Sequence, residues 1–268
     1  MRVRVGCEFV HHLDAPVHAV VQVEPRFDGA SRVRSERWSS EPELASSQYI
    51  DAFGNLCRRI DVPAGRSVLR YDAVVELGRE ADPAWPAAPE VAPADLPHEA
   101  IAFTLPSRLC PSDELASAAF ERFGDVTPGW DRVQAINDWV HAEVGFSYGS
   151  GTPVTTAADV LAAGKGVCRD FAHLAITFCR ALRIPARYAF GYLPDIDVEP
   201  AHDPMDFCAW MEVFLGGEWW TFDPRNNRRR IGRVLIGRGR DALDVAMLTT
   251  FGAAPLQSMV VWADEVTG

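Results

Sequence analysis

The chain has 268 residues, of which 48% are hydrophobic, and this combination is typical of a soluble globular protein with one large domain or two ordinary ones. The formal net charge of −11 argues against nucleic-acid and anionic-membrane partners, because both require clustered Lys and Arg side chains. No apolar segment is as long as a signal peptide or a membrane-crossing helix, which favours a cytoplasmic protein without a membrane partner. The six cysteines lack CxxC spacing, so reduced thiols are expected rather than a disulfide framework or a zinc module.

Residues 1–79 are expected to form a β-rich module. Apolar and polar residues alternate in the stretches VHAVVQVEP, SQYIDAFGNLCRRIDV and SVLRYDAVVEL, and turn residues separate them. This pattern predicts antiparallel strands. Residues 80–104 are expected to form an extended linker, since residues 80–98 contain five prolines among alanine and acidic residues.

Helical patterns follow the linker. One helix is predicted over 112–123, and a second is predicted to begin at Thr127-Pro128, an N-cap followed by proline at the first helical position. Thr156 and Asp159 have the spacing of a capping box, which predicts a short helix ending near Gly164. The stretch from Cys168 to Arg183 is apolar on every side, as in a buried central helix.

Strand patterns dominate the rest of the chain. They lie in ARYAFGYL, DFCAWMEVFL, EWWTFD, AMLTTFG and QSMVVWADEV. The predicted fold class is therefore α+β: the N-terminal antiparallel module, the linker, and a core domain over 105–268 in which the helix bearing Cys168 packs on an antiparallel sheet.

Cys168 is the first candidate for a chemical role. A cysteine in the first turn of a helix lies beside unpaired backbone N–H groups and the positive end of the helix dipole, and both favour the thiolate. Arg169 would favour it further if its guanidinium turns toward the sulfur. A buried structural thiol explains the same position equally simply.

The second candidate region is a predicted hairpin over residues 206–227 with a Gly216-Gly217 turn. Asp223 ends its second strand, where a carboxylate can orient a base on the preceding strand. An aspartate that opens a turn before proline is the alternative interpretation.

Three motifs in this order, GVCRDFAHL, an x-A-W-x-E-V strand and a W-x-x-F-D-P strand, resemble the transglutaminase-like superfamily of papain-type Cys-His-Asp enzymes. The resemblance spans about residues 105–265, and the segment containing YIDAFGN resembles the N-terminal module of many bacterial members. It implies that Cys168 is the nucleophile and that Asp223 orients the base. It also implies an acyl transferase or amide or peptide hydrolase that works through a thioester. Where the family usually has histidine, however, this chain has Cys208, so the active site is expected to be atypical.

Several interpretations of Cys208 stay open. In the first, another group supplies the base, with His202 in the loop before the hairpin as the best substitute and His173 on the wrong side of its helix. In the second, Cys168 is ionised beforehand, which suits thioesters or activated acyl groups. Cys168, Cys208 and Asp223 could hold a soft metal. Finally, the two cysteines could form a redox-responsive disulfide, or the domain could be a catalytically silent binding module.

Tyr148 and Trp210 complete the set of candidate substrate-binding residues with Arg169. The resemblance places Tyr148 at a cleft wall, where its hydroxyl could help bind a developing oxyanion. Trp210 could wall an acyl-binding cleft, although aromatic side chains in strands usually pack in the core. The chain has no nucleotide-binding loop or dense acidic cluster, so no cofactor is expected. Its negative net charge favours a neutral or cationic acyl substrate, either a small molecule or a peptide. No oligomeric state follows from these residues.

Overall fold

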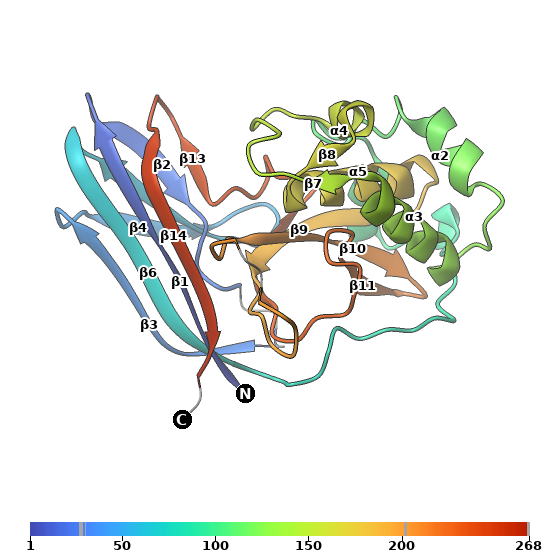
Figure 1. The fold of residues 1–268 in the computed structure, drawn as a ribbon, viewed down its shortest axis with the longest axis horizontal. Helices are drawn as coiled ribbons and strands as arrows, with labels where there is room; N and C mark the ends of the chain where they lie inside the picture. Colours follow the sequence, from blue (N-terminus) through green and yellow to red (C-terminus); the bar gives the residue numbers. More distant parts are fainter. Residues whose placement is uncertain (27–28, 30, 201–202, 267–268) are drawn as a thin grey trace.

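The computed structural model describes residues 1–26, 29, 31–200 and 203–266, and the predicted α+β class is confirmed (Figure 1). The β module consists of two four-stranded antiparallel sheets. The first has the strand order β14 (Leu256–Glu265), β1 (Arg2–Leu13), β6 (Gly65–Leu77) and β3 (Ser31–Glu41). The second has the order β13 (Leu248–Thr250), β2 (Val17–Val21), β5 (Leu56–Val62) and β4 (Ser46–Ile50).

The alternating patterns of the module produce one buried face in each sheet. In β2, Val17, Ala19 and Val21 are buried while the residues between them are partly exposed, and β6 shows the same period of two. Leu69 and Tyr71 of β6 belong to the same hydrophobic cluster as these β2 residues. Because successive side chains in a strand point to opposite faces, this spacing brings the two sheets together over a common core.

The last two strands of the chain return to the N-terminal module. β14 pairs antiparallel with β1, with Val5 opposite Ala263, and β13 pairs with β2 (Figure 1). This differs from the prediction that residues 105–268 form a single core domain. The physical reason is that β14 covers one edge of β1, whose backbone N–H and C=O groups would otherwise be unpaired.

The core contains a third antiparallel sheet, with the order β11 (Glu218–Phe222), β10 (Cys208–Leu215), β9 (Ala186–Tyr192) and β12 (Val234–Gly239). Helix α5 (Cys168–Ala181) packs against β10 and β9, as predicted for the buried helix. The module contacts the same core sheet: the Tyr192 hydroxyl donates to the Val23 carbonyl at 2.8 Å. With cover on both sides, every residue of β10 is buried, and its one charged residue, Glu212, pairs with Arg187 and Arg238.

The predicted hairpin is formed by β10 and β11. Gly216 and Gly217 connect the strands with φ angles of 60° and 94°, values that favour glycine. In the ladder, Met211 lies opposite Phe222, so Asp223 follows the end of β11 near the beginning of β10. This arrangement brings Asp223 into the neighbourhood of Cys208.

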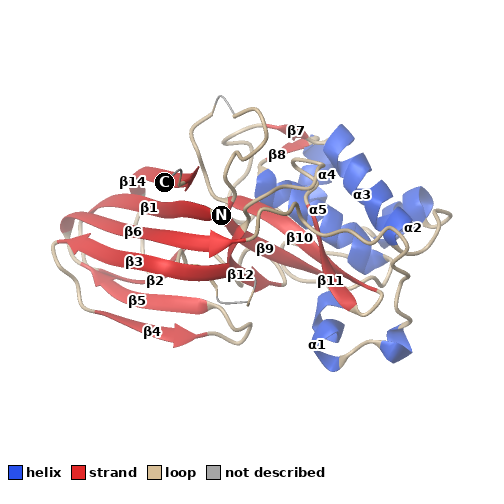
Figure 2. Ribbon diagram, turned by 90° about the horizontal axis from the view of Figure 1, so that it is seen from below, coloured by secondary structure: helices blue, strands red, loops and turns tan. Residues whose placement is uncertain are grey.

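Helices α2 (Ala116–Phe123), α3 (Trp130–Glu143) and α4 (Ala157–Ala163) pack around α5, while α1 (His98–Ile101) lies apart near β11 (Figure 2). The core also has 3-10 turns at Pro93–Asp95 and Ala102–Thr104 and a short parallel pair, β7 (Gly145–Phe146) and β8 (Lys165–Gly166). The Thr156 capping box of α4 is confirmed, whereas α2 starts four residues later than predicted.

Helix α3 begins at Trp130, and the prediction of an N-cap at Thr127 was wrong. Gly129 precedes the helix with a φ of 107°, and its N–H donates to Glu90 Oε1 at 3.0 Å. A Cβ at this position would lie 2.6 Å from the Ala88 carbonyl oxygen. The helix start is therefore determined by the close approach of the proline-rich segment, which the local pattern does not reveal.

The proline-rich segment runs along the core and is held by it (Figure 1). The Pro89 carbonyl accepts from Gly216 N–H at 2.8 Å, and the Ala88 carbonyl accepts from Trp130 N–H at 3.0 Å. Because proline lacks an N–H, the segment offers its carbonyls to neighbouring elements. Within the described residues, no helix has the length and apolar character needed to cross a membrane.

Candidate active site

The start of α5 is built around the carboxylate of Asp170. Its Oδ2 accepts from the Val167 N–H at 3.0 Å, and its Oδ1 accepts from the Arg169 guanidinium at 2.9 Å. The side chain is fully buried, and a Cβ at Gly166 would lie 2.6 Å from the Asp170 Cβ. The Gly-Val-Cys-Arg-Asp sequence therefore fixes the backbone at Cys168, the first residue of the helix.

Asp170→Ala is expected to lower the free energy of unfolding by about 1–3 kcal/mol, because a buried N–H and a guanidinium lose their acceptor. The midpoint and slope of urea unfolding measure this change. Asp159→Ala removes the capping carboxylate of α4, which is exposed, and serves as the control with a smaller expected loss. Equal losses in the two variants would contradict the role of Asp170.

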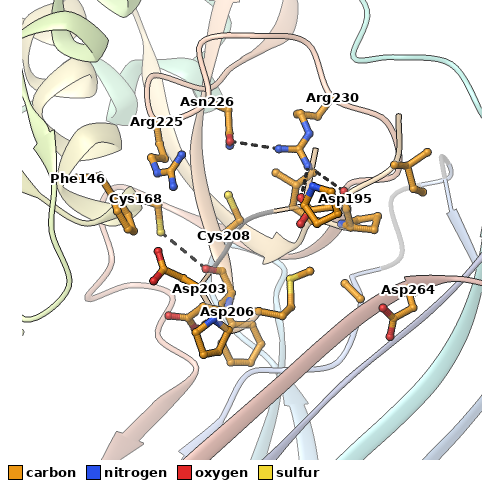
Figure 3. Close-up of a pocket in the computed structure, with 18 of the residues that line it drawn as sticks. Phe146, Cys168, Asp195, Asp203, Asp206, Cys208, Arg225, Asn226, Arg230 and Asp264 are labelled. Atoms are coloured by element: carbon orange, nitrogen blue, oxygen red, sulfur yellow. Dashed lines mark hydrogen bonds and ion pairs between the residues drawn. The ribbon is translucent and has the colours of Figure 1, made fainter. Parts of the chain in front are cut away.

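Cys168 is half-buried and lines a cavity of about 590 Å³ between the core and the module (Figure 3). One wall comes from the start of α5 and from Phe146 and Tyr148. The opposite wall includes Asp264, which lies on β14 of the module. Strand β14, at the edge of the first sheet of the module, therefore also forms part of the cavity wall near the Cys168 sulfur.

Cys208 lines the same cavity as Cys168, and its thiol lies 3.7 Å from the Ala209 carbonyl oxygen (Figure 3). A hydrogen bond from the Cys208 thiol lowers the pKa of Cys168, and the Ala209 N–H lowers it further, while burial opposes both. The same hydrogen bond, together with burial, raises the pKa of Cys208 well above its usual range. Cys168 is therefore the sulfur that ionises first, with Cys208 as its donor. In its neutral form, Cys168 donates to the Phe207 carbonyl at 3.8 Å.

Asp223 is buried close to Cys208, but its carboxylate binds other groups. Its Oδ2 accepts from Arg233 at 2.7 Å and from the Asn226 side chain at 2.8 Å, and its Oδ1 accepts from the Asn226 N–H at 2.9 Å. The negative charge of Asp223 contributes to the raised pKa of Cys208. The structure thus brings Cys168, Cys208 and Asp223 into one region, with Asp223 neutralised by Arg233.

Two of the predicted substrate-binding residues do not face the cavity. The Arg169 guanidinium binds Asp170 and donates to the Thr152 carbonyl at 3.0 Å, so it turns away from the Cys168 sulfur. Trp210 is only 2% exposed and packs under Arg233, whose guanidinium carbon lies 4.9 Å from the ring centroid. Both expectations are corrected: a buried carboxylate attracts Arg169, and Trp210 is a core residue.

Tyr148 does line the cavity, in agreement with the expectation for a cleft wall. Its ring packs edge-on against Phe146 with centroids 5.0 Å apart, and half of the residue is exposed. Burial raises the pKa of Tyr148, and the negative charges of Asp206, Asp203 and Cys168 raise it further. The hydroxyl consequently stays protonated and can donate a hydrogen bond.

Neither His173 nor His141 lines the cavity around Cys168. His173 is fully buried, its Nε2 accepts from the Ala242 N–H at 3.1 Å, and burial lowers its pKa to about 3. His141 is exposed on α3, with Nδ1 3.1 Å from the Pro224 carbonyl oxygen. His202 lies outside the described residues.

Three residues near the site were not predicted from the sequence: Arg233, Asn226 and Asp206. Arg233 and Asn226 bind Asp223, while Asp206 lines the cavity beside Cys168 (Figure 3). A signal for Asn226 was present, because polar residues directly after a strand often bond to a nearby aspartate. Asp206 lies two residues before Cys208, and no other feature of the surrounding sequence indicates a role for it.

The family model of the transglutaminase-like superfamily matches residues 117–224, which include Cys168, Cys208 and Asp223. A crystal structure of a candidate cysteine protease from Cytophaga hutchinsonii is 30% identical in sequence and superposes with a TM-score of 0.90, covering 100% of this chain and 91% of that protein. The chain belongs to the transglutaminase-like superfamily. The predicted family is thereby confirmed.

This transglutaminase-like chain also has relatives among mycobacterial proteins. An uncharacterized protein of Mycobacterium leprae is 27% identical over 242 residues, which cover 85% of this chain and 83% of that protein. An uncharacterized protein of Mycobacterium tuberculosis is 29% identical over 247 residues, covering 84% and 78%. The similarity therefore extends beyond the superfamily core into the β module.

The metal interpretation of the transglutaminase-like site gains no support from its geometry. No group of three or more His, Cys, Asp or Glu side chains with a metal-binding arrangement occurs within residues 1–26, 29, 31–200 and 203–266. Asp223 already accepts hydrogen bonds at both oxygens, one of them from a guanidinium. A carboxylate engaged in this way is a poor partner for two thiolates around a cation.

Proposed function

We propose that this transglutaminase-like protein is a cysteine-dependent acyl transferase or amide or peptide hydrolase with an atypical active site. The observation that carries the proposal is the environment of the Cys168 sulfur. It lies at the first residue of α5, faces a cavity, and has a lowered pKa because the Cys208 thiol and the Ala209 N–H favour the thiolate. These features are those of a nucleophilic cysteine.

The reaction proceeds in two stages. The Cys168 thiolate attacks the carbonyl carbon of the substrate, a C–S bond forms, and the bond to the leaving group breaks as that group takes up a proton. Water or an amine then attacks the thioester, loses a proton, and releases Cys168. Backbone N–H groups at the start of α5 and the Tyr148 hydroxyl are suited to stabilise the oxyanion formed at each stage.

Cys208 and Asp223 have roles different from those of histidine and aspartate in a conventional triad. Cys208 supports the nucleophile as a hydrogen-bond donor, since its own thiol keeps its proton. Asp223 binds Arg233 and Asn226, and its charge helps to keep the Cys208 thiol protonated. This division of roles defines the atypical site.

The charge of the cavity favours a neutral or cationic acyl substrate, either a small molecule or a peptide. Among the described residues, six carboxylates and two guanidinium groups line it; the carboxylates belong to Asp195, Asp197, Asp203, Asp206, Asp264 and Glu265, and the guanidinium groups to Arg225 and Arg230. An excess of negative charge in a recessed site attracts cations and repels anions.

Alkylation by iodoacetamide tests the nucleophile. Cys168 is expected to react faster than each of the other five cysteines by about tenfold or more at neutral pH, because its thiolate is favoured and its sulfur faces a cavity. Burial raises the pKa of Cys7 and of Cys110 to about 12, which makes them internal controls. Peptide mapping by mass spectrometry gives the rates. Equal labelling of the accessible thiols would instead support a non-catalytic module on the same fold.

A further inference from the structure

The proposed function leaves the proton carrier unassigned. An amide leaving group must gain a proton, and the water that attacks the thioester must lose one. The Cys208 thiol holds its proton too strongly to act as a base, because its pKa is raised by the Cys168 hydrogen bond and by burial. Histidine is absent from the cavity lining within the described part of the chain. Among the described residues, the carboxylates of the cavity lining are therefore the candidates for the carrier.

Asp206 lies at the right place for this task. Its Oδ1 accepts from the Phe207 N–H at 2.7 Å, and the carbonyl of the same Phe207 accepts from the Cys168 thiol at 3.8 Å. One residue thus connects the carboxylate to the sulfur. Figure 3 shows Asp206 beside Cys168 in the cavity, and the charge of Asp206 acts on the pKa of Cys168.

The other carboxylates are less suitable. Asp195 binds Arg230 at 2.9 Å, Asp197 and Glu265 both pair with Arg79, and Asp223 binds Arg233. A guanidinium that pairs with a carboxylate occupies oxygen atoms that would otherwise be open to the substrate. Two further carboxylates, Asp203 and Asp264, are exposed to solvent.

Asp206 combines partial burial with access to the cavity. Burial raises the pKa of its carboxyl group, and the hydrogen bond from Phe207 offsets this only in part. A carboxyl group whose pKa moves toward neutrality exchanges its proton more readily at neutral pH than an ordinary aspartate. The negative charges of Asp206 and Cys168 both raise the pKa of Tyr148, so these three groups lie close enough to interact electrostatically.

We propose that Asp206 carries the proton in the reaction of Cys168, a role that rests on the proposed function of that cysteine. In acylation, the Cys168 thiolate attacks, and the Asp206 carboxylic acid protonates the leaving group as its bond to the acyl carbon breaks. In deacylation, the resulting Asp206 carboxylate takes a proton from the attacking water as the C–S bond breaks, which regenerates the Cys168 thiolate and the Asp206 carboxylic acid.

Acetylation with p-nitrophenyl acetate tests this role, because p-nitrophenolate leaves as an anion and needs no proton. In Asp206→Asn the initial burst of p-nitrophenolate should persist, while steady-state turnover falls by about 10²-fold and acetyl-enzyme accumulates in the intact mass spectrum. Iodoacetamide alkylation of Cys168 should be no slower in this variant, since the charge of Asp206 raises the pKa of Cys168. Asp125→Asn, which changes an exposed carboxylate outside the cavity lining, should change neither phase.

Wild-type deacylation provides a second measurement that does not depend on the variant folding. Its rate should fall as the pH drops through the pKa of Asp206, which lies above the usual range for aspartate. The titratable and charged groups that line this part of the cavity with Asp206 are Asp203, Tyr148, Arg225, Cys168 and Cys208, and in the acetyl-enzyme Cys168 does not titrate. Absence of this pH dependence would overturn the role of Asp206.

The remaining outcomes separate the two proposals. Unchanged steady-state turnover in Asp206→Asn, or loss of the burst together with turnover, would overturn the role of Asp206 as proton carrier. Absence of any burst in the wild-type protein would instead overturn the proposed function of Cys168, and with it the basis of this inference. Partial recovery of turnover in Asp206→Glu would support a proton-carrying carboxylate.

Discussion

Cys168→Ala is expected to abolish turnover of acyl substrates, with a loss of at least about 10⁴-fold, because no other group in the cavity can form the thioester. Cys208 has the only other thiol in the cavity lining of the described residues, and it keeps its proton. The substitution removes a half-buried sulfur while Asp170 still holds the helix start. Hydrolysis of p-nitrophenyl acetate and circular dichroism measure activity and fold.

Cys179→Ala is the matched control for this prediction. Cys179 lies on the same helix, is fully buried, and has a pKa raised by burial. Its variant should lose stability but keep its turnover. Wild-type turnover in Cys168→Ala would show that Cys168 is not the nucleophile.

Cys208→His is expected to increase hydrolysis by about 10²-fold or more, which is the usual contribution of a general base. The imidazole would lie beside the Cys168 sulfur, in place of a thiol that keeps its proton. Asp223 lies close enough to act electrostatically on position 208, although its carboxylate is shared with Arg233. Steady-state hydrolysis of p-nitrophenyl acetate and of an amide substrate measures the gain.

Cys208→Ser separates this effect from a change in packing. A serine hydroxyl has nearly the volume of the thiol and is no better as a base, so no gain in turnover is expected. Thermal unfolding of both variants checks the fold, because position 208 is buried. Unchanged turnover in a folded Cys208→His protein would mean that the missing histidine does not limit the reaction.

The α5 helix and the hairpin could be predicted because their signals are local. The apolar run after Cys168 matches a helix in which every residue from Asp170 to Ala181 is buried. Adjacent glycines mark the turn between two strands of the expected lengths. Their positions then bring Cys168, Cys208 and Asp223 near one another without any further information.

The electrostatics of the site could not be predicted, because they depend on distant residues. Arg233 binds Asp223 ten positions earlier and also binds Asp82, which lies 151 positions away in the proline-rich segment. This buried cation neutralises Asp223 and covers Trp210. No local pattern predicts such a contact, and for that reason both Asp223 and Trp210 have surroundings that differ from the expectation.

The walls of the cavity come from both the module and the core, and this arrangement depends on pairing between strands that are far apart in the sequence. β14 looks like any other strand in the sequence, and its pairing with β1 joins residues about 260 positions apart. That pairing places Asp264 in the cavity wall. Strand β14 therefore contributes to the candidate site, although the motifs that identify it lie between residues 166 and 224.

The pH dependence of Cys168 alkylation tests the central claim most directly. Because the Cys208 hydrogen bond lowers the pKa of Cys168, its alkylation by iodoacetamide should persist to a lower pH than that of free cysteine. Cys208→Ala removes the donor and should move the midpoint of the alkylation curve to higher pH. A midpoint at or above that of free cysteine in the wild-type protein, unmoved in Cys208→Ala, would contradict an activated nucleophile at Cys168.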